Sequence, residues 1–489
     1  MKFKILLIKP NLCVRKGFYL QEKMCPPLGL AYLAGSLIEA GYEVEILDMV
    51  AASSESWPYK TTHIAHGLTD QGLIEKIKEY GPDLAGVGGF TSQYSRIKDI
   101  IAAIKAFNPE IKIVAGGVHA TVMPEQMMKE TKVDFVIRGE GELAMVALTR
   151  ALEAKDYKKI ESIDGIGYRD GDKIVINPKV NFEQNLDNLP WPARQLFDYK
   201  KYIEDDQAMP VITSRSCPGR CSFCSVHLFS GYAWRARDPI KVVDEIEAFV
   251  KRWGYKTVSI FDDACNIIPQ RLITILQEII RRQLKIKITF PGGLVTKYIT
   301  KDLLYWMKQS GVVSLIIPLE HSNEHMRNNV IGKNLDIEKA FEVLNWCREL
   351  EILTMVNFVI GMPGETKESI EDIIQFIKKN ALLVDALAVY IATPFPGSPF
   401  YDQCLEKGYL LNPVRNNFLD FDLYSTHIET TTMPSSLLEN YKKTIEQAFL
   451  EARGKDFPAD YIRKAIRKPD EETSDYIHNA YFKNLKSPR

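Results

Sequence analysis

Cys217-Pro-Gly-Arg-Cys221-Ser-Phe-Cys224 is the stretch on which the interpretation of this 489-residue chain depends. The three cysteines are spaced C-x3-C-x2-C beside a proline and a glycine, so we expect a loop that folds back and aims three thiolates at one point. Iron–sulfur clusters that only carry electrons take four protein ligands. Three ligands leave one iron of a cubane [4Fe-4S] cluster open, and an open coordination position indicates chemistry rather than scaffolding.

Two other interpretations of these cysteines stay open at this point. A structural zinc ion needs a fourth ligand, and His227, three residues after Cys224, could supply it. The thiols could also simply lie buried.

The chain on the C-terminal side of the loop alternates short apolar runs with amphipathic helical stretches such as 240–253 and 369–380. Each apolar run ends in a polar or glycine-rich turn. The predicted strands are 209–214, 256–261, 286–290, 312–317, 355–360 and 386–391. Six strands are too few for a closed eight-stranded barrel.

The chain on the N-terminal side predicts a parallel, doubly wound sheet, because strands alternate with helices. The predicted strands are 4–8, 42–47, 84–89, 112–115 and 135–137, with helices at 29–41 and 92–106. Ligands of such sheets bind at the carboxyl ends of the strands. Glycine-rich turns fall there at 88–92, 116–119 and 139–141, and glycine lets backbone amides approach a ligand closely.

Four domains are expected. Residues 1–150 form the doubly wound unit, and 151–205 form a connector with a hairpin around Asp170-Gly171 and a stiff Pro190-Trp-Pro192 crossing. Residues 206–414 form the second unit. Residues 415–489 form a small appendage with a helix at 437–453 and a polar tail, which caps the second unit or contacts a partner.

Composition excludes several classes of protein. The 62 basic and 63 acidic residues nearly cancel, so there is no global charge for binding nucleic acid. The other five cysteines are scattered, which argues against a secreted disulfide framework. The apolar run at the N-terminus is too short for a signal peptide or a membrane span. We expect a cytoplasmic protein with no transmembrane segment.

The cysteine spacing resembles that of the radical S-adenosylmethionine (SAM) enzymes. The resemblance implies a [4Fe-4S] cluster bound by Cys217, Cys221 and Cys224, whose free iron chelates the amino and carboxylate groups of SAM. An electron from the cluster would then cleave SAM and yield a 5'-deoxyadenosyl radical. The resemblance also implies an open (β/α)6 partial barrel of the TIM type.

Further motifs match the SAM-binding positions of this family. They are Phe223 before the last cysteine, Leu319-Glu-His-Ser322, the G-x-P-G-E turn at 361–365, and the turn at 393–398. A histidine separates Glu320 from Ser322, which departs from the family's Glu-Ser pair. The residues that the resemblance assigns to SAM are Phe223, Asp262, Glu320, Gly361, Pro363, Gly364 and Pro396.

Two aspartates and two arginines near these motifs can each be interpreted in two ways. Asp262 and Asp263 follow a predicted strand, and neighbouring strand residues point to opposite faces, so only one should face the site. Packing and a role beside SAM are both open for this pair. Arg235 and Arg237 contact a carboxylate or a phosphate, or they are solvated.

The N-terminal third resembles the cobalamin-binding domain that precedes many radical SAM domains. The resemblance is carried by 26–34, by Gly116-Gly-Val-His-Ala-Thr121 and by Arg138-Gly-Glu-Gly-Glu142. It assigns cobalamin to Leu28, Gly29, Thr91, Ser92, Gly116, Gly117, His119, Gly139 and Glu140. The chain has no D-x-H-x-x-G motif, so no histidine is evident to replace dimethylbenzimidazole on cobalt. His119 is either a ligand or a hydrogen-bonding turn residue.

Together the two resemblances indicate a cobalamin-binding radical SAM enzyme, a group that includes the class B methyltransferases and the anaerobic Mg-protoporphyrin monomethyl ester cyclases. The commonest chemistry of the group is cobalamin-dependent methylation of an unactivated carbon. Radical cyclisation, rearrangement and carbon–carbon coupling use the same scaffold, with or without cobalamin. A non-catalytic corrinoid or cluster sensor is the alternative from another class. The expected partners are a reductant such as flavodoxin or ferredoxin and a small-molecule, peptide or lipid substrate.

Overall fold

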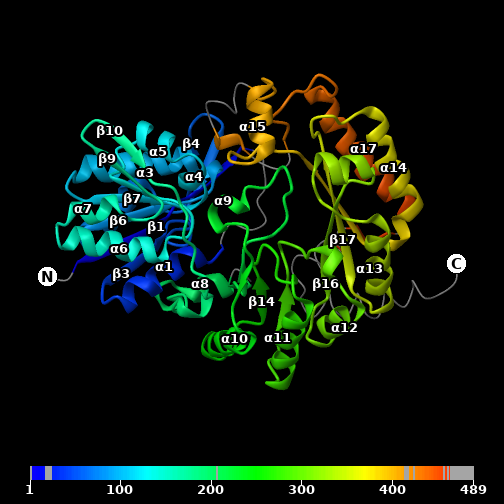
Figure 1. The fold of residues 1–489 in the computed structure, drawn as a ribbon, viewed down its shortest axis with the longest axis horizontal. Coiled ribbons are helices and arrows are strands. Elements are labelled where there is room, and N and C mark those ends of the chain that lie inside the picture. Colours follow the sequence, from blue (N-terminus) through cyan, green and yellow to red (C-terminus); the bar gives the residue numbers. More distant parts are fainter. Residues whose placement is uncertain are drawn as a thin grey trace.

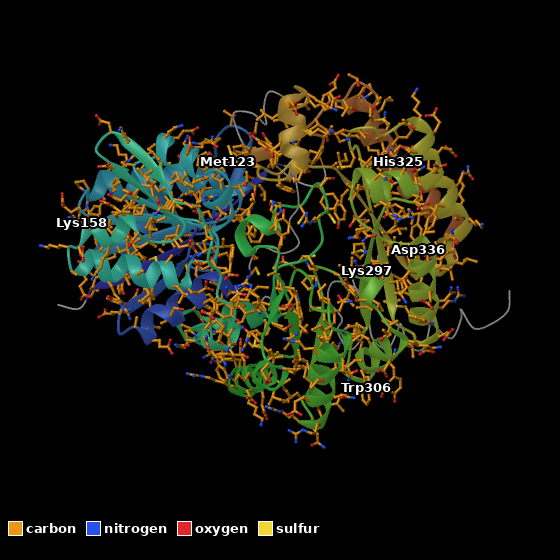
Figure 2. The ribbon with its side chains drawn as sticks, in the orientation of Figure 1. Met123, Lys158, Lys297, Trp306, His325 and Asp336 are labelled. Carbon is orange, nitrogen blue, oxygen red and sulfur yellow. The ribbon has the colours of Figure 1, made fainter. Side chains whose placement is uncertain are left out.

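The computed structural model describes residues 3–16, 25–204, 208–411, 418–421, 425–454, 457–459 and 462. The N-terminal and C-terminal parts of the chain lie side by side, with the segment that carries the cysteines between them (Figure 1). Met123 lies on the side of the first part that faces the second, and Lys158 lies on the opposite side (Figure 2). The polar tail predicted beyond Arg453 falls almost entirely outside the described residues.

The first part is built on a seven-stranded sheet of order β10-β9-β8-β7-β6-β1-β3. Its parallel strands are β1 (Lys4–Lys9), β3 (Glu43–Asp48), β6 (Leu84–Gly88), β7 (Lys112–Gly116) and β8 (Phe135–Ile137). The chain winds in opposite directions from β1, so the strand order reverses between β1 and β6. Such a switch point opens a ligand-binding crevice at the carboxyl ends of the strands.

Both faces of this sheet are covered, which is why β1 has a continuous apolar run. Leu6 and Ile8 pack in the core shared with α2 (Asp70–Tyr80) and α3 (Tyr94–Phe107). Ile5 and Leu7 pack in a second core with α1 (Leu28–Glu39) and α6 (Glu142–Glu153). The predicted mixed α/β unit with a mainly parallel sheet is confirmed.

The predicted hairpin forms, but it belongs to this sheet. β9 (Ile166–Asp170) and β10 (Lys173–Ile176) pair antiparallel around Gly171, which has a φ of 59°. β9 also pairs antiparallel with β8. A small antiparallel sheet was not predicted: β2 (Leu12–Arg15), β5 (His63–His66) and β4 (Ser56–Tyr59) lie beyond the end of β1. These strands have four residues each and little alternation, so the sequence carries no clear signal for them.

In the second part all six predicted strands form. They are β11 (Met209–Val211), β14 (Thr257–Ile260), β15 (Lys287–Thr289), β16 (Ser314–Glu320), β17 (Leu353–Ile360) and β18 (Ala386–Ile391). They pair as two parallel sheets of three, β11-β14-β15 and β16-β17-β18. One continuous barrel sheet therefore stays a prediction.

Helices cover the outer face of these sheets. They are α10 (Pro239–Trp253), α11 (Pro269–Arg281), α12 (Lys301–Gln309), α13 (Ile337–Glu349) and α14 (Lys367–Asn380). Side chains of β17 alternate accordingly: Val356, Phe358 and Ile360 are fully buried, whereas Met355 and Asn357 on the other face are half-buried. The second face is therefore the open one, as expected of a sheet whose inner side receives ligands.

The remaining helices and strands are shorter. They are α4 (Gly117–Val122), α5 (Pro124–Glu130), α7 (Tyr157–Glu161), α8 (Tyr199–Glu204), β12 (Ser214–Arg215), α9 (Val226–Ser230), β13 (Arg235–Ala236) and α15 (Pro399–Glu406), with short helical turns η1 (Thr91–Gln93), η2 (Leu186–Asn188), η3 (Arg194–Leu196), η4 (Thr296–Tyr298), η5 (His325–Val330), η6 (Ala381–Leu383) and η7 (Phe418–Asp420).

The predicted C-terminal helix is α17 (Ser435–Arg453), and it packs in the core of the second part of the chain. Leu438, Ile445 and Phe449 are at most 2% exposed, and the helix runs beside α14 (Figure 1). α17 thus completes the outer wall of the β16-β17-β18 sheet. In the described part of the chain, no helix combines the length and apolarity needed to cross a membrane.

Replacing Leu438 by Ala should lower the free energy of unfolding by about 2–5 kcal/mol, because it opens a cavity in the core that α17 shares with β17 and β18. Chemical denaturation followed by circular dichroism measures this change. Glu439, exposed on the same helix, provides the control: its replacement by Ala should change stability by no more than about 0.5 kcal/mol. Equal effects of the two variants would contradict the packing of α17.

Candidate functional site: the cysteine loop and the facing sheet edge

The cysteine loop is closed at its base by a two-stranded ribbon. β12 and β13 pair antiparallel, with Ser214 opposite Ala236 and Arg215 opposite Arg235. Ser216 follows with a φ of 75°, and its hydroxyl donates to the carbonyl of Gly231 at 2.5 Å. The chain therefore leaves and re-enters the second unit at one place, and residues 217–234 project as a closed loop.

All three cysteines are half-buried free thiols on this loop. The N–H of Cys224 donates to the carbonyl of Cys221 at 3.0 Å, and the N–H of Gly219 donates to Cys217 Sγ at 3.4 Å. Burial raises the pKa of all three thiols, that of Cys224 to about 11. The Cys217 thiolate also raises the pKa of Cys221 and Cys224, and the Cys221 thiolate raises that of Cys224, so a bound metal, which takes thiolates, would relieve this repulsion.

The donor set fits an iron–sulfur cluster, since three thiols stand on one loop. In the described chain, however, no three His, Cys, Asp or Glu side chains converge closely enough to hold a metal ion. A site for a single metal ion is thus not formed there, whereas a cubane takes each thiolate on a different iron, so ligation of a cluster by the three thiols stays a prediction. His227 stacks on Tyr232, with ring centroids 4.9 Å apart.

Of the two neighbouring aspartates, the structure places Asp263 beside the loop. Asp262 accepts from the N–H and hydroxyl of Thr213 and from the hydroxyl of Ser214, each at 2.6 Å. Both its oxygens therefore hold the end of β11, which favours the packing alternative. Asp263 is exposed, and its charge raises the pKa of Cys217 and Cys224. The resemblance assigns Asp262 to SAM, but Asp263 is the aspartate that lies beside the cysteine loop.

Glu320 is held in an unusual backbone conformation at the end of β16. It follows a register shift in the pairing with β17 and has a φ of 67°, which is rare for a residue other than glycine. Strained residues of this kind gather at functional sites. Its carboxylate accepts from the Lys333 ammonium at 2.7 Å. Sequence reasoning missed Lys333, because a single lysine in a loop carries no motif.

The histidine that interrupts the Glu-Ser pair turns away from Glu320. His321 is fully buried, and its Nδ1 accepts from the N–H of Asn323 at 2.9 Å. Nε2 therefore carries the proton, and it lies 3.2 Å from Glu365 Oε1. Glu365 also accepts from the N–H of Gly361 at 3.3 Å, which closes the G-x-P-G-E turn. His321 thus ties the end of β16 to the turn after β17.

The other SAM-assigned positions follow from this turn. Gly361 and Gly364 have φ values of 92° and 97°, and Gly364 is exposed with open space at its Cβ position. Pro363 and Pro396 are buried, and Phe223 packs in the core that contains β1 and β6. The structure therefore presents Gly364 to solvent and uses the prolines and Phe223 for packing.

The two parts of the chain meet at Gly397, in the turn after β18. A Cβ there would lie 2.4 Å from Leu228 Cδ1 of α9 and 2.9 Å from Val122 Cγ1 of α4. Only glycine fits at such an approach. The N–H of Phe400 also donates to the carbonyl of Ser222, between two of the cysteines, at 2.9 Å. The cysteine loop thus contacts both the turn after β18 and the first unit. Its helix α9 lies between the two parts of the chain (Figure 1).

At the carboxyl edge of the first sheet, where cobalamin is expected, the turns after β6 and β7 are in tight contact. A Cβ on Gly117, whose φ is 81°, would lie 2.9 Å from the nitrogen of Gly89. Gly117 and Gly29 are exposed at this edge, whereas Leu28 and Thr91 are buried. The glycine turns after β6 and β7 therefore meet at the carboxyl edge of the sheet, where a switch point places ligands, and the cobalamin contacts of the assigned residues stay a prediction.

The other positions assigned to cobalamin make contacts within the protein or are partly buried. Gly116 stands so close to Gly88 that a Cβ on Gly88 would lie 2.7 Å from its carbonyl oxygen. Ser92 belongs to η1 and is half-buried. The N–H of Gly139 donates to the Thr121 hydroxyl at 2.9 Å.

His119 is buried, and within the described residues one of its ring nitrogens has no hydrogen-bond partner. It stacks on Tyr94 at 4.0 Å and lies edge-on to Phe418 at 5.5 Å between centroids. Nδ1 lies 3.4 Å from the Thr91 hydroxyl, and the buried Nε2 makes no hydrogen bond within the described chain. Burial lowers the pKa of His119 to about 4, so the ring is neutral at pH 7. The ring is therefore enclosed by aromatic packing, and its role toward cobalamin stays a prediction.

Glu140 forms an ion pair that joins the two parts of the chain. It accepts from both terminal nitrogens of Arg235, at 2.9 and 2.6 Å. Glu142 accepts from Arg215 at 2.6 Å, and although burial acts to raise its pKa, Arg215 holds that pKa below the usual range. A cobalamin contact by the Glu140 carboxylate would have to compete with this bidentate pair. Arg237 likewise donates to buried Glu245 at 2.6 Å, so neither arginine is solvated.

Comparison with known proteins gives two family matches. The B12 binding domain matches residues 22–149, and the radical SAM superfamily matches residues 211–377. An uncharacterized methyltransferase of Pyrococcus horikoshii is 28% identical over 87% of this chain and 87% of its own length. The anaerobic magnesium-protoporphyrin IX monomethyl ester cyclase of Cereibacter sphaeroides is 27% identical over 86% of this chain and 66% of its own length.

A solved structure has the same overall fold. The radical SAM methyltransferase TsrM from Kitasatospora setae, with cobalamin and a [4Fe-4S] cluster bound, superposes with a TM-score of 0.71 over 99% of both chains, at 18% identity. The two units and their order are thus shared with a protein that holds both cofactors.

Glu140→Gln should lower the free energy of unfolding by about 3 kcal/mol, because it leaves the buried Arg235 guanidinium without its carboxylate. Glu125→Gln is the control, since Glu125 pairs with Lys129 on the surface, and such pairs contribute about 0–1 kcal/mol. Urea denaturation of both variants measures the difference. A loss of less than about 1 kcal/mol for Glu140→Gln would contradict a structural role for this pair.

His119 should make the protein sensitive to mild acid. Its folded-state pKa lies below the ordinary value of 6.5, so the stability that the neutral ring contributes is complete above pH 6.5 and is lost as pH falls toward 4. Between pH 7 and 4.5 the wild type should lose about 2–3 kcal/mol more than His119→Gln. Denaturation of the cofactor-free proteins at a series of pH values measures this. Parallel pH profiles would show that His119 is not buried neutral.

Proposed function

We propose that this chain, which belongs to the radical SAM enzymes that carry a B12-binding domain and uses a [4Fe-4S] cluster, SAM and cobalamin, transfers a methyl group to an unactivated carbon. When bound, the cluster supplies the electron that cleaves SAM, and the corrinoid carries the methyl group. The related methyltransferase and the shared fold with TsrM support this choice among the reactions of the family.

The contact between the cysteine loop and the corrinoid-side edge is the observation that carries the proposal. α4 follows the glycine turn of β7, α9 follows Cys224, and both reach the same glycine, Gly397. The carbonyl of Phe229 in α9 also lies 3.4 Å from the Cβ position of Gly139. A methyl group must pass between two cofactor sites over a short distance, and this packing brings their loops into contact.

Different residues of the chain would bind the cluster and the separate parts of SAM. Cys217, Cys221 and Cys224 would hold the cluster, and the strained Glu320 would receive the ammonium of the amino-acid part of SAM. The G-x-P-G-E turn offers exposed backbone at Gly364. His321 fixes this turn relative to Glu320 through Glu365, so the two contacts keep a constant separation.

Cobalamin would be bound by backbone groups at the carboxyl edge of the first sheet and by one histidine. Exposed Gly29 and Gly117 leave room for a flat macrocycle over the sheet edge, and His119 offers a neutral nitrogen toward it. Axial ligation of cobalt and a hydrogen bond to a corrin amide are both compatible with a neutral imidazole.

The proposed domain plan follows the order of the sheets. Residues 1–150 form the corrinoid-binding unit, to which the hairpin of the connector at 151–205 adds two strands. Residues 206–414 form a (β/α)6 partial barrel from the two three-stranded sheets, and 415–489 form the C-terminal appendage, whose helix α17 completes the barrel wall. A flavodoxin or ferredoxin would donate the electron, and the protein would act in a reducing cytoplasm on a small molecule, peptide or lipid.

Replacing Cys217, Cys221 or Cys224 by Ser should abolish cluster binding and reduce 5'-deoxyadenosine release to background, because each removes one of three ligands. Each variant is purified anaerobically and reconstituted with iron and sulfide, and iron content and nucleoside release are measured. Cys25→Ser is the matched control, because Cys25 is exposed and lies outside the loop. Full iron content in any of the three loop variants would refute the ligand assignment.

The same sample tests methyl transfer before a substrate is known. With hydroxocobalamin, a strong reductant and SAM labelled on its methyl group, we expect up to one S-adenosylhomocysteine per corrinoid, with the label on the corrinoid. Protein reconstituted without corrinoid should give none. Cleavage of SAM to 5'-deoxyadenosine with no S-adenosylhomocysteine in either sample would exclude methyl transfer.

Ring formation is the second candidate, because the related cyclase is almost as similar as the methyltransferase. Radical cyclisation leaves the methyl group of SAM untouched. The labelling experiment therefore separates the two reactions.

A further inference from the structure

Lys333 stands beside the cysteine loop because two segments are joined by hydrogen bonds. The N–H of Ser222 donates to the carbonyl of Ile331 at 2.8 Å, and the Ser222 hydroxyl donates to the carbonyl of Val330 at 2.9 Å. Gly332 has a φ of 76°, and a Cβ there would lie 3.0 Å from the carbonyl oxygen of Arg220. The segment that ends in Lys333 therefore packs directly against the backbone between Cys221 and Cys224.

The charge of Lys333 is held in place by a single carboxylate. Its side chain is 16% exposed, that of Glu320 is 8% exposed, and the ammonium donates to Glu320 at 2.7 Å. Within the described chain no other acceptor is hydrogen-bonded to this ammonium. The N–H of Lys333 also donates to the carbonyl of buried Arg327 at 2.9 Å, so the backbone from which the side chain starts is fixed.

The two charges have opposite signs and stand beside the loop, so they act in opposite directions on any charge that the loop carries. Burial acts to lower the pKa of Lys333, but Glu320 and Cys221 raise it above its ordinary value, so the amine stays charged. Both charges are largely shielded from solvent, so little water screens them from the loop.

We infer that Lys333 and Glu320 form a charge pair that sets the reduction potential of the cluster on this loop. The inference rests on the proposed ligation of the cluster by Cys217, Cys221 and Cys224. Reduction adds one negative charge to a cluster, and net charge nearby is one of the determinants of its potential. The Lys333 ammonium stabilises the reduced form, and the Glu320 carboxylate destabilises it. With both present, the potential is kept within reach of a physiological donor.

The test is an anaerobic redox titration of the reconstituted protein, followed by electron paramagnetic resonance, without SAM or substrate. Lys333→Met should shift the midpoint potential to a more negative value, and Glu320→Gln should shift it to a more positive value. The double variant should lie between the two single variants, and Lys333→Arg, which keeps the charge, should stay near the wild type. Lys105→Met is the matched control, because Lys105 forms an equally short, partly buried pair with Asp134 in the first unit, also at 2.7 Å.

Shifts of the two single variants in the same direction, or shifts no larger than that of Lys105→Met, would overturn the inference. Iron content is measured for each variant. If Lys333→Met retains no iron, Glu320→Gln decides: a positive shift supports the charge pair, and an unchanged potential refutes it. Because methyl transfer is not part of the measurement, a protein that cleaves SAM without transferring its methyl group would refute the proposed function and leave this result unaffected.

Discussion

The ion pairs between the ribbon β12–β13 and the loop after β8 are the constraint on which the candidate site depends. Arg215 and Arg235 lie directly opposite each other on the ribbon, where like charges repel. Glu140 and Glu142 of the first unit neutralise them from the other side of the interface. Because the four charges are largely buried, the ribbon is stable only when it is docked on the first unit. The cysteine loop therefore keeps one orientation toward the corrinoid-side edge.

Apolar and aromatic packing continues this connection. One hydrophobic core contains Ile8 and Val87 of the first sheet together with Met362 and Phe400 of the second unit. From there, aromatic rings link His119 through Phe418 and Phe421 to Phe395, with successive centroids 5.5 Å apart. Packed side chains therefore fill the contact between the two parts of the chain.

Strand positions and motif turns were largely predictable, because each depends on contiguous residues. The buried runs of β1 and β17, the G-x-P-G-E turn and the start of α17 after Pro434 all appear where hydrophobic periodicity and turn chemistry place them. The roles of individual polar side chains were less predictable. Asp262 holds a strand end while Asp263 faces the loop, and Glu140 serves an interface. In each case the partner comes from a strand or loop distant in the sequence.

The sequence by itself determined the two α/β units, their order, and the cofactor chemistry that three cysteines at C-x3-C-x2-C spacing indicate. Only the tertiary structure decided which polar side chains pair around the site: Lys333 with Glu320, His321 with Glu365, and the arginines of the ribbon with the first unit. The physical reason is one of range. Periodicity and motif spacing act over a few residues and can be read along the chain, whereas ion pairs depend on the path of the backbone between residues 13 to 95 positions apart.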